Sequence, residues 1–250
     1  MTWDERQRAM LAEMGHRLPP IAAAAPAMDA APEPEPIVVA APPPVVMRVA
    51  VPPPAPAAPS SFNGLDLPAL REAVSACRAC GLCEQRRSAV FGGGAQQQVQ
   101  WLVVTDPPDE TDDAAGEPFA GEAGRLLDRM LLAAGQRRAG DGATAFVTPI
   151  VKCRPPRGRA PQPAELDACD AVLARQVELL QPRLVLAMGL QAARRLTGLA
   201  EPLGRLRGRL HSWGGLPLVV TYHPAYLLRS PADKAGAWDD LCLARKTSKT

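Results

Sequence analysis

The stretch FVTPIVKCRPP, residues 146–156, joins an apolar run to a cysteine, a basic residue and two prolines. Its first half is rich in aromatic and β-branched residues, which predicts a buried strand. Cys153 comes directly after that strand, and in parallel sheets binding residues gather at the carboxyl ends of strands. Pro149 lies inside the run and lacks a backbone N–H, so we expect a local bulge there.

Working outward, the same kind of apolar run recurs, and the predicted strands are residues 99–105, 144–151, 182–189 and 216–223. Between them the spacing of apolar residues and the placement of Pro and Gly predict helices over residues 123–135, 163–182 and 190–198. This alternation predicts an α/β domain over residues 61–250. Its architecture is a three-layer α/β/α sandwich around a central four-stranded parallel sheet.

Residues 1–60 have a different composition, because most of the 28 prolines of the chain lie there. We expect a Pro/Ala-rich, disordered linker over residues 19–60. Residues 1–18 predict a short helix, which is either a docking segment for a protein partner or a frayed terminus. Proline every few residues excludes a membrane-spanning helix in this region.

The charge balance and the first residues exclude several classes of protein. The net charge is +2, and the start MTWDERQRAM lacks the basic and apolar regions of a signal peptide. Six cysteines are too few for a small disulfide scaffold. We therefore expect a soluble, cytoplasmic monomer. A basic run, Arg154 to Arg159, follows Cys153 and is suited either to phosphate contacts or to a solvated loop.

Four of the cysteines have a spacing that suits a metal centre. A C-x2-C pair presents two thiolates from one turn, and a strand end and the next helix supply two more. The four are Cys77, Cys80, Cys153 and Cys169. Zinc, a 4Fe–4S cluster and unliganded core thiols all remain compatible with this spacing. Cys83 extends the first pair and is an alternative ligand.

Together these segments resemble the family 4 uracil-DNA glycosylases, the iron–sulfur branch of the uracil-DNA glycosylase superfamily. The matching pieces run in family order from about Cys77 to Ala244. They are CRACGLCEQRRSAVFGGG, GEPFAGEAGRLLDRML, VKCRPPRGRAPQPAELDAC, LRGRLHSWGGLPLVVTYHPAYLLR and AWDDLCLA. The resemblance implies a 4Fe–4S cluster held by Cys77, Cys80, Cys153 and Cys169, and DNA as the partner. Cys83 is at a position that the family does not need.

The resemblance also implies residues for base excision, in which a nucleotide is flipped into a pocket and its glycosidic bond is hydrolysed. Phe119 would lie beneath the uracil, and His223 would donate a hydrogen bond to its O2. The loop 225–229 would wedge into the duplex through Leu227 or Leu228. The implied DNA-binding residues are Arg154, Leu227, Leu228 and Arg229.

Two positions depart from the family pattern at the centre of the site. The family motif Gly-Glu-Ala/Gly-Pro-Gly is replaced by residues 105–109, TDPPD, in which Asp106 keeps a catalytic carboxylate on a side chain one methylene shorter. Asp109 is an alternative acid. Pro149 stands at the substrate-binding position where the family has an Asn that reads the uracil edge, and proline can neither donate to a base nor accept from it through its side chain.

Three functions are compatible with this pattern. The first is an active uracil-DNA glycosylase with an altered site. The second is a paralogue that keeps the fold, the cluster and DNA binding but recognises another base or has very weak activity. The third is a non-catalytic DNA-binding or scaffold protein whose Pro-rich tail recruits a partner.

Overall fold

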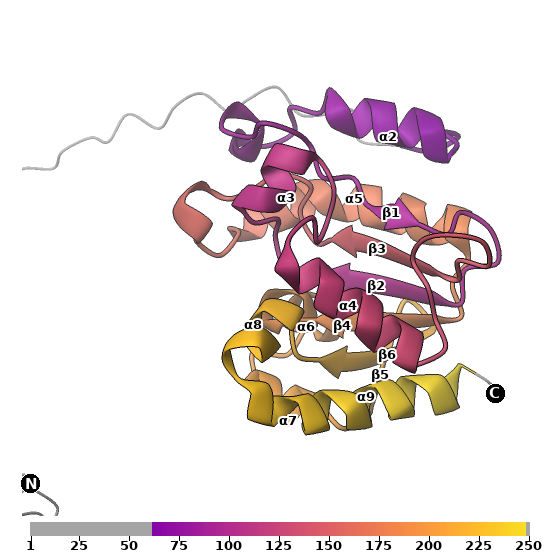
Figure 1. Ribbon diagram of the computed structural model, residues 1–250. Coiled ribbons are helices and arrows are strands. Elements are labelled where there is room, and N and C mark those ends of the chain that lie inside the picture. Colours follow the sequence, from indigo (N-terminus) through magenta and orange to yellow (C-terminus); the bar gives the residue numbers. More distant parts are fainter. Residues whose placement is uncertain (1–61, 249–250) are drawn as a thin grey trace, which may run out of the picture. The chain divides into compact units, whose positions relative to one another are not determined.

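The computed structural model describes residues 62–248, nearly all of the domain predicted over residues 61–250. The helix predicted over residues 1–18 and the linker over residues 19–60 lie outside the described residues. The described part contains a six-stranded sheet in the order β1-β3-β2-β4-β6-β5 (Figure 1). Its strands are β1 (Gly93–Gly94), β2 (Trp101–Thr105), β3 (Ala145–Pro149), β4 (Leu184–Met188), β5 (Leu210–Trp213) and β6 (Leu216–Thr221).

Eight α-helices are described, and several begin or end at residues that explain their limits. Asp66 accepts from the amide of Ala69 at 2.9 Å and caps the first helix, while Gln162 and Glu165 form a capping box at the start of the longest one. The helices are α2 (Leu67–Ser75), α3 (Glu110–Ala115), α4 (Glu122–Ala133), α5 (Pro163–Leu180), α6 (Leu190–Thr197), α7 (Leu203–Leu206), α8 (Pro224–Arg229) and α9 (Lys234–Thr247). Short 3-10 helices are η1 (Gly81–Glu84), η2 (Pro156–Gly158) and η3 (Pro231–Asp233). No helix of residues 62–248 is long and apolar enough to cross a membrane.

The three layers predicted from the sequence are confirmed, but the four-stranded sheet is not. The four predicted strands are present as the parallel centre β3-β2-β4-β6. Antiparallel strands β1 and β5 extend the sheet at its two edges. The first edge strand is two glycines, and the second alternates exposed and partly buried residues, so neither has the continuous apolar run of a central strand.

The bulge predicted at Pro149 is absent from the described sheet. Pairing between β2 and β3 runs without interruption to Thr105 and Pro149. The hydrogen bond at that pair is donated by the amide of Ile150 to the carbonyl of Thr105 at 2.9 Å. Because alternate residues of a parallel strand bond to a given neighbour, a proline at the last strand position removes no bond to β2.

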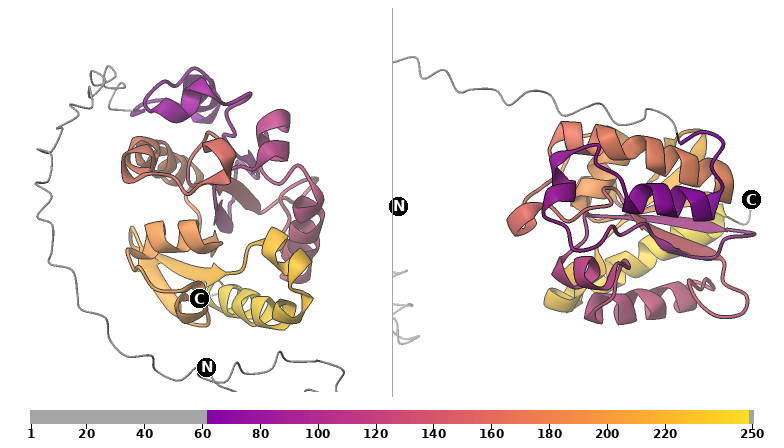
Figure 2. Two further views of the ribbon diagram at one scale, coloured as in Figure 1. Left: turned by 90° about the vertical axis from the view of Figure 1, so that its left-hand side faces the viewer. Right: turned by 90° about the horizontal axis from the view of Figure 1, so that it is seen from above.

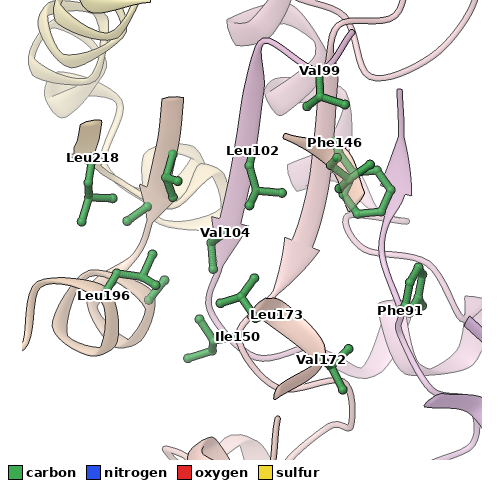
Figure 3. Packing of buried hydrophobic residues seen from close by; sticks show 14 of the residues in the cluster. Phe91, Val99, Leu102, Val104, Phe146, Ile150, Val172, Leu173, Leu196 and Leu218 are labelled. Atoms are coloured by element: carbon green, nitrogen blue, oxygen red, sulfur yellow. The ribbon is translucent and has the colours of Figure 1, made fainter. Parts of the chain in front are cut away.

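Both faces of the central strands are buried, and alternate residues of these strands enter different hydrophobic clusters. Leu102 and Val104 of β2 pack with α2, α5 and α6, whereas Trp101 and Val103 pack with α4 and α9. Figure 1 and the right view of Figure 2 show α4 and α9 on one face of the sheet and α5 and α6 on the other. Figure 3 shows the first cluster, where Leu173 and Ile150 meet Val104.

The order of the strands determines where a site can form. β3, the next strand in the chain, pairs with one side of β2. β4 pairs with the other side of β2 and is itself followed in the sheet by β6. The carboxyl ends of β2 and β4 therefore flank the point at which the winding of the sheet reverses, and in such sheets ligands bind at this point. Asp106 follows β2 and Gly189 follows β4, so both residues lie at the reversal.

Candidate functional site

A cavity of about 350 Å³ opens at the carboxyl ends of the parallel strands. The left view of Figure 2 looks onto this end of the sheet. The cavity brings together five of the residues that the sequence singled out, which come from the end of β2, the α3–α4 connection, and α8 with its N-cap. They are Asp106, Phe119, His223, Leu228 and Arg229. Asp109, the alternative acid, also lines it.

His223 is held in one tautomer by the start of α8. Its Nδ1 accepts a hydrogen bond from the amide of Ala225 at 3.2 Å, which caps the helix. In the neutral ring the proton is therefore on Nε2, which can donate. Burial lowers the pKa of His223 to about 4, while Asp109 raises it and Arg229 lowers it further. The imidazole is thus a neutral hydrogen-bond donor at physiological pH.

The ring of Phe119 stacks on the imidazole of His223, with centroids 5.1 Å apart and 22° between the planes. Only 5% of Phe119 is exposed, because its ring also joins the core cluster beneath α4. Its backbone has φ +58°, in the left-handed region that costs energy for a residue with a side chain. Phe119 is thus both a core residue and a wall of the cavity.

Asp106 lies in the cavity wall with its carboxylate directed at the start of α6. Its Oδ1 accepts from the amide of Ala192 at 2.9 Å. A side chain at Gly189 would collide with the carboxylate, which explains the glycine, with φ +105°, at that position. Burial raises the pKa of Asp106 to about 6, and hydrogen bonds from the amides of residues 190–192 oppose this rise.

The predicted DNA-binding segment 225–229 is a helix, α8, and not a loop. Within it Leu228 is 38% exposed and Arg229 is exposed, and both line the cavity mouth. Leu227 is only 1% exposed, and this burial does not fit the DNA contact predicted for it. The helix turns adjacent residues to different sides, so one leucine packs inward while the next faces solvent.

Arg154 and Pro149 do not line this cavity. Arg154 is partly exposed beside α3, where it pairs with Glu110 at 3.4 Å. Pro149 is buried, and its carbonyl accepts from the Nζ of Lys152 at 2.7 Å. The same buried ammonium donates to Thr148 at 2.5 Å and to Gln176 at 3.1 Å. Pro149 thus supplies a carbonyl oxygen to a buried polar network.

Five cysteine side chains line a second, small cavity between α2, η1 and α5. They are Cys77, Cys80, Cys83, Cys153 and Cys169, and none of the five forms a disulfide. Arg86 donates to the sulfur of Cys153 at 3.0 Å. Burial raises the pKa of Cys169 to about 12 and also raises the pKa values of Cys80 and Cys153.

The four cysteines predicted from the sequence therefore face one cavity together with Cys83. In residues 62–248 no group of three or more His, Cys, Asp or Glu side chains is arranged to hold a metal ion. The donor set nevertheless has the chemistry of an iron–sulfur site, because such clusters take four thiolates. Metal binding at these buried thiols would release protons, because the bound form of each ligand is the thiolate.

Sequence reasoning missed residues that hold the cavity wall. Asp112 accepts from the amide of Ala120 at 2.9 Å, and Arg138 donates to the carbonyl of Pro118 at 3.0 Å. These contacts are made to main-chain atoms, so the residue types alone give no signal for them. Asp109 caps α3 by accepting from Thr111 at 2.8 Å, in addition to lining the cavity.

The chain is similar to known proteins over most of the described residues. A family model described as the uracil DNA glycosylase superfamily matches residues 91–242. A type-4 uracil-DNA glycosylase from Pyrobaculum aerophilum is 38% identical over 187 residues, which cover 72% of this chain and 93% of that protein. Type-4 uracil-DNA glycosylases from Saccharolobus solfataricus and Thermotoga maritima are 32% identical over 177 residues and 35% identical over 165 residues. These matches cover 68% and 65% of this chain and 79% and 83% of the two proteins.

Proposed function

The chain belongs to the uracil-DNA glycosylase superfamily and to its type-4 branch, and from this premise we propose that it excises uracil from DNA. In this reaction the bond between N1 of uracil and C1′ of the deoxyribose breaks, and water supplies the oxygen to C1′ and a proton to the base. The products are free uracil and an abasic site in the DNA. The duplex hides this bond, so the nucleotide must first be flipped into the cavity.

The neutral imidazole of His223 is the observation that most supports this proposal. The bond breaks more easily when uracil leaves as an anion whose charge spreads onto O2. A neutral donor fixed in position stabilises that charge without losing its proton to bulk solvent. The amide of Ala225 leaves Nε2–H as the free donor, and the low pKa keeps the ring neutral.

Asp106 is suited to the cationic side of the same transition state. As uracil leaves, the sugar becomes oxocarbenium-like, and a nearby carboxylate stabilises the positive charge. The amides of residues 190–192 hold the carboxylate at the start of α6, and from the cavity wall it would accept a hydrogen bond from the attacking water. The ionised form is needed for both tasks, so a pKa of about 6 leaves Asp106 active at neutral pH.

DNA would approach across α8. Leu228 is the exposed leucine at the cavity mouth, so it is the side chain placed to fill the gap that the flipped nucleotide leaves. Arg229 beside it and Arg154 near α3 are suited to phosphate contacts. This assignment excludes Leu227, which is buried in the protein.

We further propose that Cys77, Cys80, Cys153 and Cys169 hold a 4Fe–4S cluster with a structural task. When bound, the cluster would join the segment after α2 to the loop after β3 and to α5, which places it away from His223 and Asp106. The chemistry of excision needs no electron transfer. Cys83 lines the same cavity but is not one of the four proposed ligands.

A second candidate function is a DNA-binding paralogue with very weak uracil excision. It is favoured by Pro149, which has no amide to read a base, and by Asp106, whose carboxylate is partly engaged by the start of α6. The two candidates are separated by incubating excess protein with uracil-containing single- and double-stranded DNA, followed by cleavage at abasic sites. Parallel substrates with hypoxanthine and xanthine test another base. Tight DNA binding with no product from any substrate would reject the glycosylase and favour the paralogue.

A further inference from the structure

The loop that presents Phe119 to the cavity is in a conformation that must be held in place. Phe119 has φ +58°, which a residue with a side chain adopts only when its surroundings impose it. On the other side of the loop, Gly124 packs so closely that a side chain there would collide with the carbonyl oxygen of Phe119. Neither feature follows from the stacking on His223, so other contacts must fix this backbone.

Arg138, in the connection between α4 and β3, makes those contacts. It donates to the carbonyl of Pro118 at 3.0 Å and to the carbonyl of Phe119 at 3.4 Å. Asp128 of α4 orients the guanidinium through two hydrogen bonds, of 2.6 Å from Nε and 3.2 Å from Nη2. Such a two-pronged pair fixes the plane of the guanidinium as well as its position.

The opposite end of the loop is held by Asp112, which accepts from the amide of Ala120 at 2.9 Å. One charged side chain thus holds the carbonyls of the loop and another holds an amide. Phe119 lies between them, and its ring contacts His223. A change in the loop would therefore be transmitted to the imidazole that donates to the leaving base.

We infer that Arg138 is a positioning residue that holds the Phe119 backbone, and through the Phe119 ring the imidazole of His223, in the geometry needed for excision. The catalytic consequence rests on the proposed function, whereas the structural consequence does not. The guanidinium touches neither the cavity of about 350 Å³ nor a reacting atom, so it acts only through the loop.

The surroundings of Arg138 permit a test by chemical rescue. Arg138 and Asp128 line a separate open cavity of about 740 Å³ on the other side of the loop. Removal of the side chain in Arg138→Ala would therefore leave a space that is open to solvent, with Asp128 and two carbonyl oxygens unpartnered. A guanidinium ion from solution has the shape and charge to occupy that space, whereas sodium at the same ionic strength does not.

The kinetic test compares Arg138→Ala with Arg137→Ala as a matched control. In the described residues the hydrogen bonds of Arg137 are made by its main chain, and its side chain is exposed on the same cavity. We expect Arg138→Ala to slow single-turnover excision about a hundredfold, because a displacement of about 1 Å in a catalytic group has such an effect. The affinity of Arg138→Ala for its substrate should change little, and guanidinium chloride below denaturing concentrations should restore part of its excision rate. The control Arg137→Ala should excise at the wild-type rate. Arg138→Lys keeps the positive charge but lacks the two-pronged guanidinium, so its excision should stay slow.

A second readout does not depend on activity. The chain has three histidines, so the proton resonance of the His223 ring can be assigned with His223→Asn, and His211 serves as an internal reference. In Arg138→Ala the His223 resonance should move toward its position in Phe119→Leu, while that of His211 stays unchanged. The milder variant Asp128→Asn should give a smaller shift in the same direction.

These readouts distinguish the two proposals. If the wild type does not excise uracil but the His223 resonance shifts in Arg138→Ala, the glycosylase is rejected and the positioning role of Arg138 is kept. If the wild type excises uracil, and a folded Arg138→Ala or Asp128→Asn variant keeps the wild-type His223 resonance and excision rate, the inference about Arg138 is overturned.

Discussion

The imidazole of His223 lies stacked on the ring of Phe119, with 5.1 Å between centroids. One residue precedes α4 and the other caps α8, and these two helices pack against each other. The stacked pair therefore joins two segments that are far apart in the sequence. It also couples the proposed hydrogen-bond donor to the loop held by Arg138 and Asp112.

Substitution of His223 should separate its catalytic task from its structural one. His223→Ala and His223→Asn should each slow single-turnover excision about a hundredfold or more, because both remove the Nε2–H donor. His223→Ala should also lower the free energy of unfolding by about 1 kcal/mol through loss of the helix cap, whereas asparagine is a good cap and should not. Excision rates and urea unfolding measure the two effects. Wild-type rates in both variants would reject His223 as the donor.

Asp106 and His223 should give contributions to stability that oppose each other in one pH range. Burial raises the pKa of Asp106 from 3.8 to about 6, so in this range the folded protein binds a proton that the unfolded chain lacks, and stability falls as pH rises. Burial lowers the pKa of His223 from 6.5 to about 4, so there the unfolded chain binds the proton first, and stability rises with pH. The two contributions nearly cancel in the wild type.

Single substitutions should reveal each contribution. Relative to the wild type, Asp106→Asn should gain stability as pH rises from about 4 to about 6, and His223→Asn should lose it, each by on the order of 2 kcal/mol. Urea unfolding of the three proteins at several pH values gives the comparison. Curves that stay parallel would show that neither group is perturbed in the folded state.

Pro149→Asn should raise uracil excision and discrimination against other bases, because residue 149 pairs with Thr105, which lines the cavity. An amide that donates to one base atom and accepts from its neighbour is worth roughly 1–3 kcal/mol of discrimination. The strand should tolerate the change, because Ile150 and not residue 149 donates to Thr105. Pro149→Ala restores the N–H without an amide side chain and is the matched control. If the two variants excise uracil equally, residue 149 does not read the base.

Removal of single cysteines should identify the cluster ligands. Protein purified without oxygen should be brown, and Cys153→Ser or Cys169→Ser should lose the colour and the iron. Cys83→Ser is the matched control from the same cavity and should retain both. Metal analysis and visible absorption measure the outcome. A colourless wild-type protein containing one zinc would replace the iron–sulfur assignment with a zinc site.

The central strands were predictable because both of their faces are buried. Burial on two sides requires continuous apolar sequence, as in β2 and β4, where every residue is buried. The edge strands escaped prediction because neither meets that requirement. In β1, Gly94 approaches β3 so closely that a side chain there would collide with the backbone.

The site was partly predictable for a related reason. Asp106 directly follows β2 and His223 comes two residues after β6, and the carboxyl ends of such parallel strands meet at one edge. The orientations of Leu227 and Leu228 depend on the helix they form, whereas the family resemblance implied a loop there. Arg138 gave no signal because it binds main-chain oxygens of residues distant in sequence.

Single-turnover excision from uracil-containing DNA tests the central claim most directly. Enzyme in excess over a labelled strand with one uracil should produce an abasic site at that position, and His223→Asn should abolish most of the product. A folded, DNA-binding wild-type protein that leaves uracil intact in both single and double strands would contradict the account.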